Sequence, residues 1–214
     1  MIFKDRIDAA SRLAKKLEHL RNENLVILAI PRGGVVTGDV IAKELGARLD
    51  IIVSRKIGAP HNPELAIGAV MHDGSFYPNA GIISSLNVPK QYIESEIKTQ
   101  LKEIERRLLK FRGDTKYDLE GKTAVVVDDG IATGATMFAA IMWLKKQHTK
   151  RLIAAIPVGP KDTIERLSQL VEVVVLEAPE FFNAVGEFYD EFEQVEDIRV
   201  VEILRRHGYK GGKS

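Results

Sequence analysis

The 214-residue sequence contains no cysteine. Disulfide bridges, thiolate zinc sites and cysteine nucleophiles are therefore excluded as features of this chain. The sequence also lacks an apolar run long enough to span a membrane, and its first residues do not form an apolar signal segment. We therefore expect a cytoplasmic protein that has no membrane partner.

An excess of charge of either sign is also missing. The chain has 31 Lys and Arg residues against 30 Asp and Glu residues, which gives a formal net charge of +1. No strong basic patch and no helix-turn-helix pattern is visible, so we expect no nucleic-acid partner. The five histidines are scattered singly and none forms a His-Glu-x-x-His motif, so we expect no metal held directly by the protein.

Short apolar runs alternate with amphipathic segments through most of the chain. This alternation predicts an α/β fold with a doubly wound, mostly parallel sheet, in which ligands bind beyond the carboxyl ends of the strands. The predicted strands are 25–30, 49–54, 67–70, 75–77, 123–127, 151–158 and 173–176, and the predicted helices are 5–21, 35–45, 89–112, 134–146 and 162–170.

Residues 55–65 are expected to form a polar loop, because Gly58, Pro60 and Pro63 interrupt any regular pattern. Further along, Asp73-Gly74 predicts a hairpin turn between two short strands. We expect one domain over residues 1–214, with a helical insertion at about 89–113.

The segment from Asp128 to Thr136 carries the strongest functional signal. An apolar strand delivers two adjacent acids, Asp128 and Asp129, to a turn of small residues and threonines that opens a helix. Amides at a helix N-terminus favour an anion, and small residues let the backbone approach it closely. Each feature alone is weak, because a helix cap or a solvated turn would also explain it. Together, directly after a buried strand, they predict a phosphate-binding site with two carboxylates beside it.

This segment resembles the motif with which type I phosphoribosyltransferases bind 5-phosphoribosyl-1-pyrophosphate (PRPP). The resemblance implies that Asp128 and Asp129 bind the two ribose hydroxyls of PRPP. It also implies that the turn binds the 5-phosphate. The turn residues of the implied PRPP site are Gly130, Ala132, Thr133, Gly134, Ala135 and Thr136.

A second loop, Pro31-Arg32-Gly33-Gly34, follows the first predicted core strand. Alone it would be an ordinary turn, but its position matches the pyrophosphate loop of the same family, which often holds a non-proline cis peptide. Backbone amides of such a loop bind anions, and Arg32 adds positive charge. The resemblance therefore implies that Pro31, Arg32, Gly33 and Gly34 bind the pyrophosphate of PRPP.

Two basic residues, Arg55 and Lys56, leave the second predicted strand. They resemble the start of the flexible catalytic loop of the family, which closes over PRPP and excludes water. In that role they would be catalytic residues, together with Asp128 and Asp129, and would neutralise the departing pyrophosphate. His61 and Glu64 are proton-transfer candidates, although ordinary polar loop residues are the better interpretation of both.

One position departs from part of the family. Members that act on 6-oxopurines typically carry an acid three positions after the second acid of the pair, where this chain has Ala132. Members that act on adenine or uracil resemble the chain better at this position. The segments 29–35 and 63–70 most resemble a bacterial and archaeal group of phosphoribosyltransferase-domain proteins.

Aromatic residues gather near the C-terminus, at Phe181, Phe182, Phe188 and Tyr189. In the family a small hood over the sheet edge holds the acceptor base, and we expect that hood at about 179–208 together with the N-terminal helix. These rings would stack on a base or pack the hood, and packing is the safer interpretation. Trp143 is also interpreted as core.

The resemblance implies a transferase of nucleotide salvage. It would move the phosphoribosyl group of PRPP to a nitrogenous base, with Mg²⁺ as cofactor, bound through PRPP and water, and a homodimer as the assembly. A non-catalytic PRPP or nucleotide sensor is the alternative, although no added nucleic-acid-binding module is visible. A dinucleotide-binding protein is disfavoured, because Gly33, Gly34 and Gly38 lack the G-x-G-x-x-G spacing.

Overall fold

The structure is a computed structural model and describes residues 2–211. Its helices and strands are, in chain order, α1 (Arg6–Leu17), the 3-10 helix η1 (Glu18–Leu20), β1 (Leu25–Ala29), α2 (Gly33–Leu45), β2 (Arg48–Ile51), β3 (Ser54–Ala59), β4 (Asn62–Met71), β5 (Phe76–Pro78), α3 (Ala80–Ser85), α4 (Lys90–Phe111), β6 (Thr123–Val127), α5 (Ala135–Leu144), β7 (Arg151–Val158), α6 (Lys161–Ser168), β8 (Glu172–Glu177), the 3-10 helix η2 (Val185–Phe188) and α7 (Asp197–Arg206).

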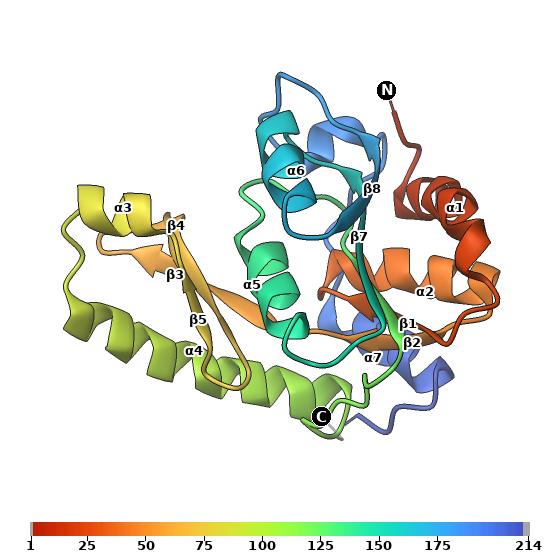
Figure 1. Ribbon diagram of the computed structural model, residues 1–214, viewed down its shortest axis with the longest axis horizontal. Coiled ribbons are helices and arrows are strands. Elements are labelled where there is room, and N and C mark those ends of the chain that lie inside the picture. The colour runs from red at the N-terminus through yellow and green to blue at the C-terminus, as the bar shows by residue number, and fades with distance from the viewer. Residues whose placement is uncertain (1, 212–214) are drawn as a thin grey trace.

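Five parallel strands form the main sheet, in the order β2-β1-β6-β7-β8. In Figure 1, α1 and α2 lie on one side of this sheet and α5 and α6 on the other. All five residues of β6 are buried, and alternate residues belong to the two core clusters: Val125 and Val127 pack with α1 and α2, while Ala124 and Val126 pack with α5 and α6. A strand covered on both faces reads as an unbroken apolar run. The predicted doubly wound sheet is confirmed.

A second sheet of three antiparallel strands, β3-β4-β5, stands apart from the first (Figure 1). It contains the predicted turn at Asp73-Gly74, where the amide of Met71 donates to the carbonyl of Ser75 at 2.9 Å. The long helix α4 lies along this sheet, and the Tyr92 hydroxyl donates to the Gly58 carbonyl at 3.1 Å. The predicted helix at 89–112 is therefore confirmed.

The polar loop expected at 55–65 was wrong. Most of these residues belong to β3 and β4, and only Pro60 and His61 form the turn between the two strands. The pairing shifts register around Gly58, and a Cβ at Gly58 would lie 2.7 Å from the Cα of Pro63. Glycine and proline therefore sit opposite each other at a β-bulge, where both are tolerated. Residue types that favour loops thus occur inside a hairpin.

The N-terminal segment pairs with the segment that follows β8. The Phe3 amide donates to the Phe188 carbonyl at 3.0 Å, and the Asp190 amide donates to the Phe3 carbonyl at 2.9 Å. A small apolar cluster of Phe3, Ala9, Val158 and Tyr189 seals this junction. The N-terminal segment and the segment after β8 are therefore held together beside the carboxyl ends of the strands. Among residues 2–211, no helix is both long and apolar enough to cross a membrane.

Candidate functional site

The candidate site lies where the direction of winding reverses. β1 and β6 are neighbours in the sheet. After β1 the chain continues through α2 to β2 on one side, and after β6 it continues through α5 to β7 on the other. In sheets of this kind ligands bind beyond the carboxyl ends of the two strands whose connections diverge, and we call this place, beyond β1 and β6, the crevice. The structure places both predicted ligand loops, 31–34 and 128–136, at this reversal point.

The two loops touch through Gly33 and Gly34. A Cβ on Gly33 would lie 1.8 Å from Oδ2 of Asp129, and a Cβ on Gly34 would lie 2.9 Å from the Cα of Asp128. Only glycine allows this approach of the α2 backbone to the acid pair. The Pro31–Arg32 peptide is cis, as the resemblance had implied.

Two helices begin at this crevice. α2 begins at Gly33, and α5 begins at Ala135 after Gly134, whose φ of +72° lies in the left-handed region that favours glycine. The first amides of a helix have no intrahelical partner, and the helix dipole is positive at that end. The start of α2 lies beside the acid pair, and the start of α5 lies in the turn that follows the pair. The crevice therefore offers amide donors at two separate points, as a ligand with two phosphate groups would require.

The acid Asp129 has a partner that the sequence analysis missed. Nε of Arg6 donates to Oδ2 of Asp129 at 2.6 Å, and both side chains are nearly buried. The Arg6 guanidinium also stacks 3.8 Å from the centre of the Phe192 ring. In addition, the Tyr189 hydroxyl donates to the Asp129 carbonyl at 2.5 Å. The junction of the N-terminal segment with the segment after β8 thus fixes Asp129 in place.

The other acid, Asp128, is in a different electrostatic state. Burial raises the pKa of Asp128 well above its ordinary value, and the adjacent Asp129 charge raises that pKa further. Oδ1 of Asp128 accepts a hydrogen bond from the Asp129 amide at 2.9 Å. The site therefore combines one carboxylate paired with an arginine and one that resists ionisation in the free protein. A ligand that brings positive charge or hydroxyl donors to Asp128 lowers the free-energy cost of ionising its carboxyl group.

The raised pKa of Asp128 predicts that the stability of the protein depends on pH. Because the folded pKa of Asp128 is raised, its ionisation costs stability as the pH rises above the ordinary aspartate range. Asp128→Asn removes the charge and keeps the oxygen that accepts from Asp129. We expect this variant to raise the melting temperature at pH 7 by at least about 2 °C, the shift that roughly 1 kcal/mol gives in a domain of this size. Near pH 3, where Asp128 is protonated in both states, the gain should vanish. Equal melting curves at pH 7 would contradict the raised pKa.

The basic residues predicted at this site have partners elsewhere. Nε of Arg55 donates to Oε1 of Gln100 on α4 at 3.0 Å. Nζ of Lys56 pairs with Oε2 of Glu64 at 3.0 Å across the hairpin. His61 lies in the exposed turn of the hairpin. The structure therefore does not bring these four side chains to the acid pair.

Arg32 is partly exposed and contacts an acid of α7. Its guanidinium Nη1 is 3.5 Å from Oδ1 of Asp197 at the start of α7, and Nζ of Lys110 pairs with the same carboxylate at 2.7 Å. Two cations thus share one acid, and Asp197 links the loop to α4 and α7. A 3.5 Å contact between half-exposed groups is weak, so Arg32 is available to an anion.

The aromatic residues of the predicted hood have different roles. Tyr189 is buried and stacks on Phe192 with ring centres 4.8 Å apart. Phe182 stacks on Phe188 at 5.3 Å, whereas Phe181 is 92% exposed. Trp143 is buried in the core, as predicted. Packing therefore accounts for Tyr189 and Trp143.

The acid pair fits the way in which Mg²⁺ is expected to be held. In the described range 2–211, no three His, Asp or Glu side chains gather to form a metal cage. Asp128 and Asp129 supply hard carboxylate oxygens, which Mg²⁺ accepts directly or through water while it keeps most of its ligands from phosphates. The residues present are compatible with an ion that arrives with a phosphorylated ligand.

Comparison with known proteins agrees with this geometry. Residues 2–193 match the family described as the phosphoribosyl transferase domain. A Mycobacterium tuberculosis protein, provisionally named a phosphoribosyl transferase in both strains CDC 1551 and H37Rv, is 40% identical over 207 residues, which cover 96% of this chain and 47% of that protein.

The chain thus spans about half the length of the curated relatives that it matches. The crystal structure of TT1426 from Thermus thermophilus is 38% identical, with a TM-score of 0.82, and the match covers 99% of this chain and 100% of that one. The chain belongs to the phosphoribosyl transferase domain family.

Proposed function

We propose that the protein is a Mg²⁺-dependent phosphoribosyltransferase that transfers the 5-phosphoribosyl group of PRPP to a nitrogenous base. The observation that carries this proposal is the contact between the Gly33-Gly34 backbone and the acid pair, beside a helix N-terminus that follows the same acids. Three anion- or hydroxyl-binding elements then line one crevice, and PRPP has three matching parts: a pyrophosphate, a ribose diol and a 5-phosphate.

Each element has a defined role in this proposal. Asp128 and Asp129 accept hydrogen bonds from the ribose hydroxyls, and the amides of residues 133–136 bind the 5-phosphate. The amides of Gly33 and Gly34 bind the pyrophosphate, and Arg32 turns from Asp197 toward it. Mg²⁺, when bound, neutralises charge on the pyrophosphate oxygens. A base nitrogen attacks C1 of the ribose while the bond from C1 to the pyrophosphate oxygen breaks, and the proton of that nitrogen passes to water or to the released pyrophosphate, so the protein acts by positioning and charge neutralisation.

The hairpin residues Arg55 and Lys56 require a movement to take part. In the free protein Lys56 is paired with Glu64, which is 91% exposed, so this ion pair contributes little and is easily exchanged. We propose that Lys56 leaves Glu64 for the pyrophosphate as the crevice closes. Arg55 is half-buried against α4 and is the weaker candidate.

A screen for the acceptor tests the function. Purine and pyrimidine bases are incubated with PRPP and Mg²⁺, and pyrophosphate release is measured, with the Asp128→Asn/Asp129→Asn variant as control. We expect release with at least one base. We also expect adenine- or uracil-type acceptors to exceed 6-oxopurines, because Ala132 stands where an acid would serve the latter. Tight PRPP binding without release for any base would instead favour the nucleotide-sensing alternative.

A further inference from the structure

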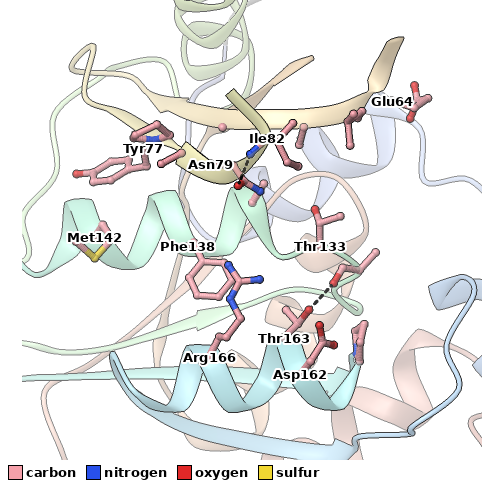
Figure 2. A pocket seen from close by; sticks show the side chains of 18 of the residues that line it. Glu64, Tyr77, Asn79, Ile82, Thr133, Phe138, Met142, Asp162, Thr163 and Arg166 are labelled. Carbon is pink, nitrogen blue, oxygen red and sulfur yellow. Dashed lines mark hydrogen bonds between the residues drawn. The ribbon is translucent and has the colours of Figure 1, made fainter. Parts of the chain in front are cut away.

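The loop at residues 31–34 and the turn at residues 133–136 have different surroundings. The turn borders a cavity of about 860 Å³ between α5, α6 and the β3-β4-β5 sheet, where the Thr163 hydroxyl donates to the Ala132 carbonyl at 3.2 Å (Figure 2). The loop instead contacts the start of α7, a helix that packs against both α2 and α4 (Figure 1). A charged side chain of α7 therefore lies within reach of the loop that we propose binds pyrophosphate.

That side chain belongs to Asp197, the first residue of α7, which contacts two cations from distant parts of the chain. Its Oδ2 accepts from Nζ of Lys110 at 2.7 Å, and its Oδ1 lies 3.5 Å from Nη1 of Arg32. The hydrogen bond from Lys110 lowers the pKa of Asp197, and the charge of Arg32 lowers that pKa further. Asp197 is therefore ionised at neutral pH. In the free protein it contacts the guanidinium that a bound anion would use.

The two cations depend on Asp197 to different degrees. Within residues 2–211, no other carboxylate lies in ion-pair range of the Arg32 guanidinium or of Nζ of Lys110. Lys110 makes the shorter contact, so Asp197 keeps a partner when Arg32 leaves. The departure of Arg32 therefore leaves no acid unpaired, and it costs little because both groups of the contact are partly exposed. The arrangement permits Arg32 to exchange between Asp197 and an anion on the loop.

We propose that Asp197 competes with pyrophosphate for Arg32, and that Lys110 limits this competition because it neutralises part of the Asp197 charge. The inference rests on the proposed function, since that function places the pyrophosphate on residues 31–34. Asp197 is then a positioning residue. It holds Arg32 beside the loop in the free protein, releases it to the incoming ligand and takes it back as pyrophosphate leaves. Its negative charge weakens the binding of pyrophosphate and so favours release of this product.

Calorimetry with Mg-pyrophosphate tests the competition through two single variants. Asp197→Asn keeps the size of the side chain and removes its charge, so it should bind pyrophosphate at least about threefold more tightly than wild type, an effect within the range of a partly exposed ion pair. Lys110→Ala should bind at least about twofold more weakly, because Asp197 then pairs with Arg32 alone. A purely structural contact between Asp197 and Lys110 would instead make both variants bind more weakly.

Two double variants assign these effects to Arg32. In an Arg32→Ala background, Asp197→Asn should no longer raise the affinity for pyrophosphate, because the shared cation is missing. In an Asp197→Asn background, Lys110→Ala should have no further effect. A loss of affinity that persists there would overturn the role given to Lys110. The control is Glu202→Gln, which removes another exposed acid of α7 and should leave the affinity for pyrophosphate unchanged.

Ribose 5-phosphate separates this inference from the proposed function. In the proposed site it reaches the acid pair and the turn at residues 133–136 but not Arg32. Its affinity should therefore be the same in every variant, which also shows that each variant is folded. If Asp197→Asn binds Mg-pyrophosphate no more tightly than wild type does, or gains as much affinity without Arg32, the competition is overturned. If neither Mg-pyrophosphate nor ribose 5-phosphate binds, the proposed function itself fails and the inference falls with it.

Discussion

The Asp128→Asn/Asp129→Asn variant should lose affinity for Mg-PRPP by at least about a hundredfold and remain folded. The expected loss follows from the chemistry of the pair, because hydrogen bonds to a charged carboxylate contribute roughly 1.5–3 kcal/mol each and weaken when the acceptor is neutral. The fold should survive, since an asparagine oxygen at 129 still accepts from Nε of Arg6, which donates at 2.6 Å in the present protein. Titration calorimetry and a melting curve on the same sample measure both properties.

The matched control for this variant is Asp118→Asn. Asp118 is also an acid in contact with a basic residue, since its carboxylate pairs with Lys122 at 2.7 Å, but it is exposed and remote from the crevice. Its replacement should leave PRPP affinity within about twofold, because an exposed pair contributes little. If the double variant binds PRPP as tightly as the control does, the acid pair is not the ribose site.

Gly33→Ala should abolish PRPP binding through a single methyl group. The added Cβ would lie 1.8 Å from Oδ2 of Asp129, so the carboxylate must turn away from Arg6 and from the ribose position. We expect at least about a hundredfold loss of affinity, since the displaced carboxylate loses hydrogen bonds to the ribose that contribute roughly 1.5–3 kcal/mol each. The melting temperature should also fall, because the displaced carboxylate leaves the nearly buried Arg6 guanidinium without its partner.

Alanine variants at two other glycines serve as comparisons for Gly33→Ala. Gly81→Ala in α3 meets no atom closer than 3.7 Å and should change neither affinity nor stability. Gly34→Ala would bring a Cβ to 2.9 Å from the Cα of Asp128. Because backbone rather than a side chain must then move, this variant should also lower the melting temperature. Wild-type affinity in Gly33→Ala would show that the loop and the acid pair do not act on one ligand.

The sequence predicted the parts of the fold that local pattern determines. β6 and β7 have the bounds predicted for them, because each is an apolar run bordered by turns. The hairpin β3-β4 was missed because Gly58 and Pro63 indicate a loop unless their pairing at a bulge is known. That pairing is a tertiary fact, and the residues of one segment do not reveal it.

The sequence also predicted the parts of the candidate site whose residues are contiguous in the chain. The loop at 31–34 and the turn at 128–136 are contiguous, so each could be identified from its own residues. Arg6 could not be identified in this way, because it is 123 positions from Asp129 and lies on an amphipathic helix like any surface arginine. Arg55 and Lys56 were assigned by their order along the chain, whereas the pleat of β3 points them to different partners. Sequence order locates ligand loops better than it locates side-chain directions.

A structure of the protein with Mg²⁺ and PRPP bound is the most direct test of the proposed site. We expect the 5-phosphate to lie against the amides of residues 133–136, the ribose hydroxyls on Asp128 and Asp129, and the pyrophosphate against Gly33 and Gly34. Density for the 5-phosphate away from this turn, or a ribose that does not contact the acid pair, would contradict the central claim.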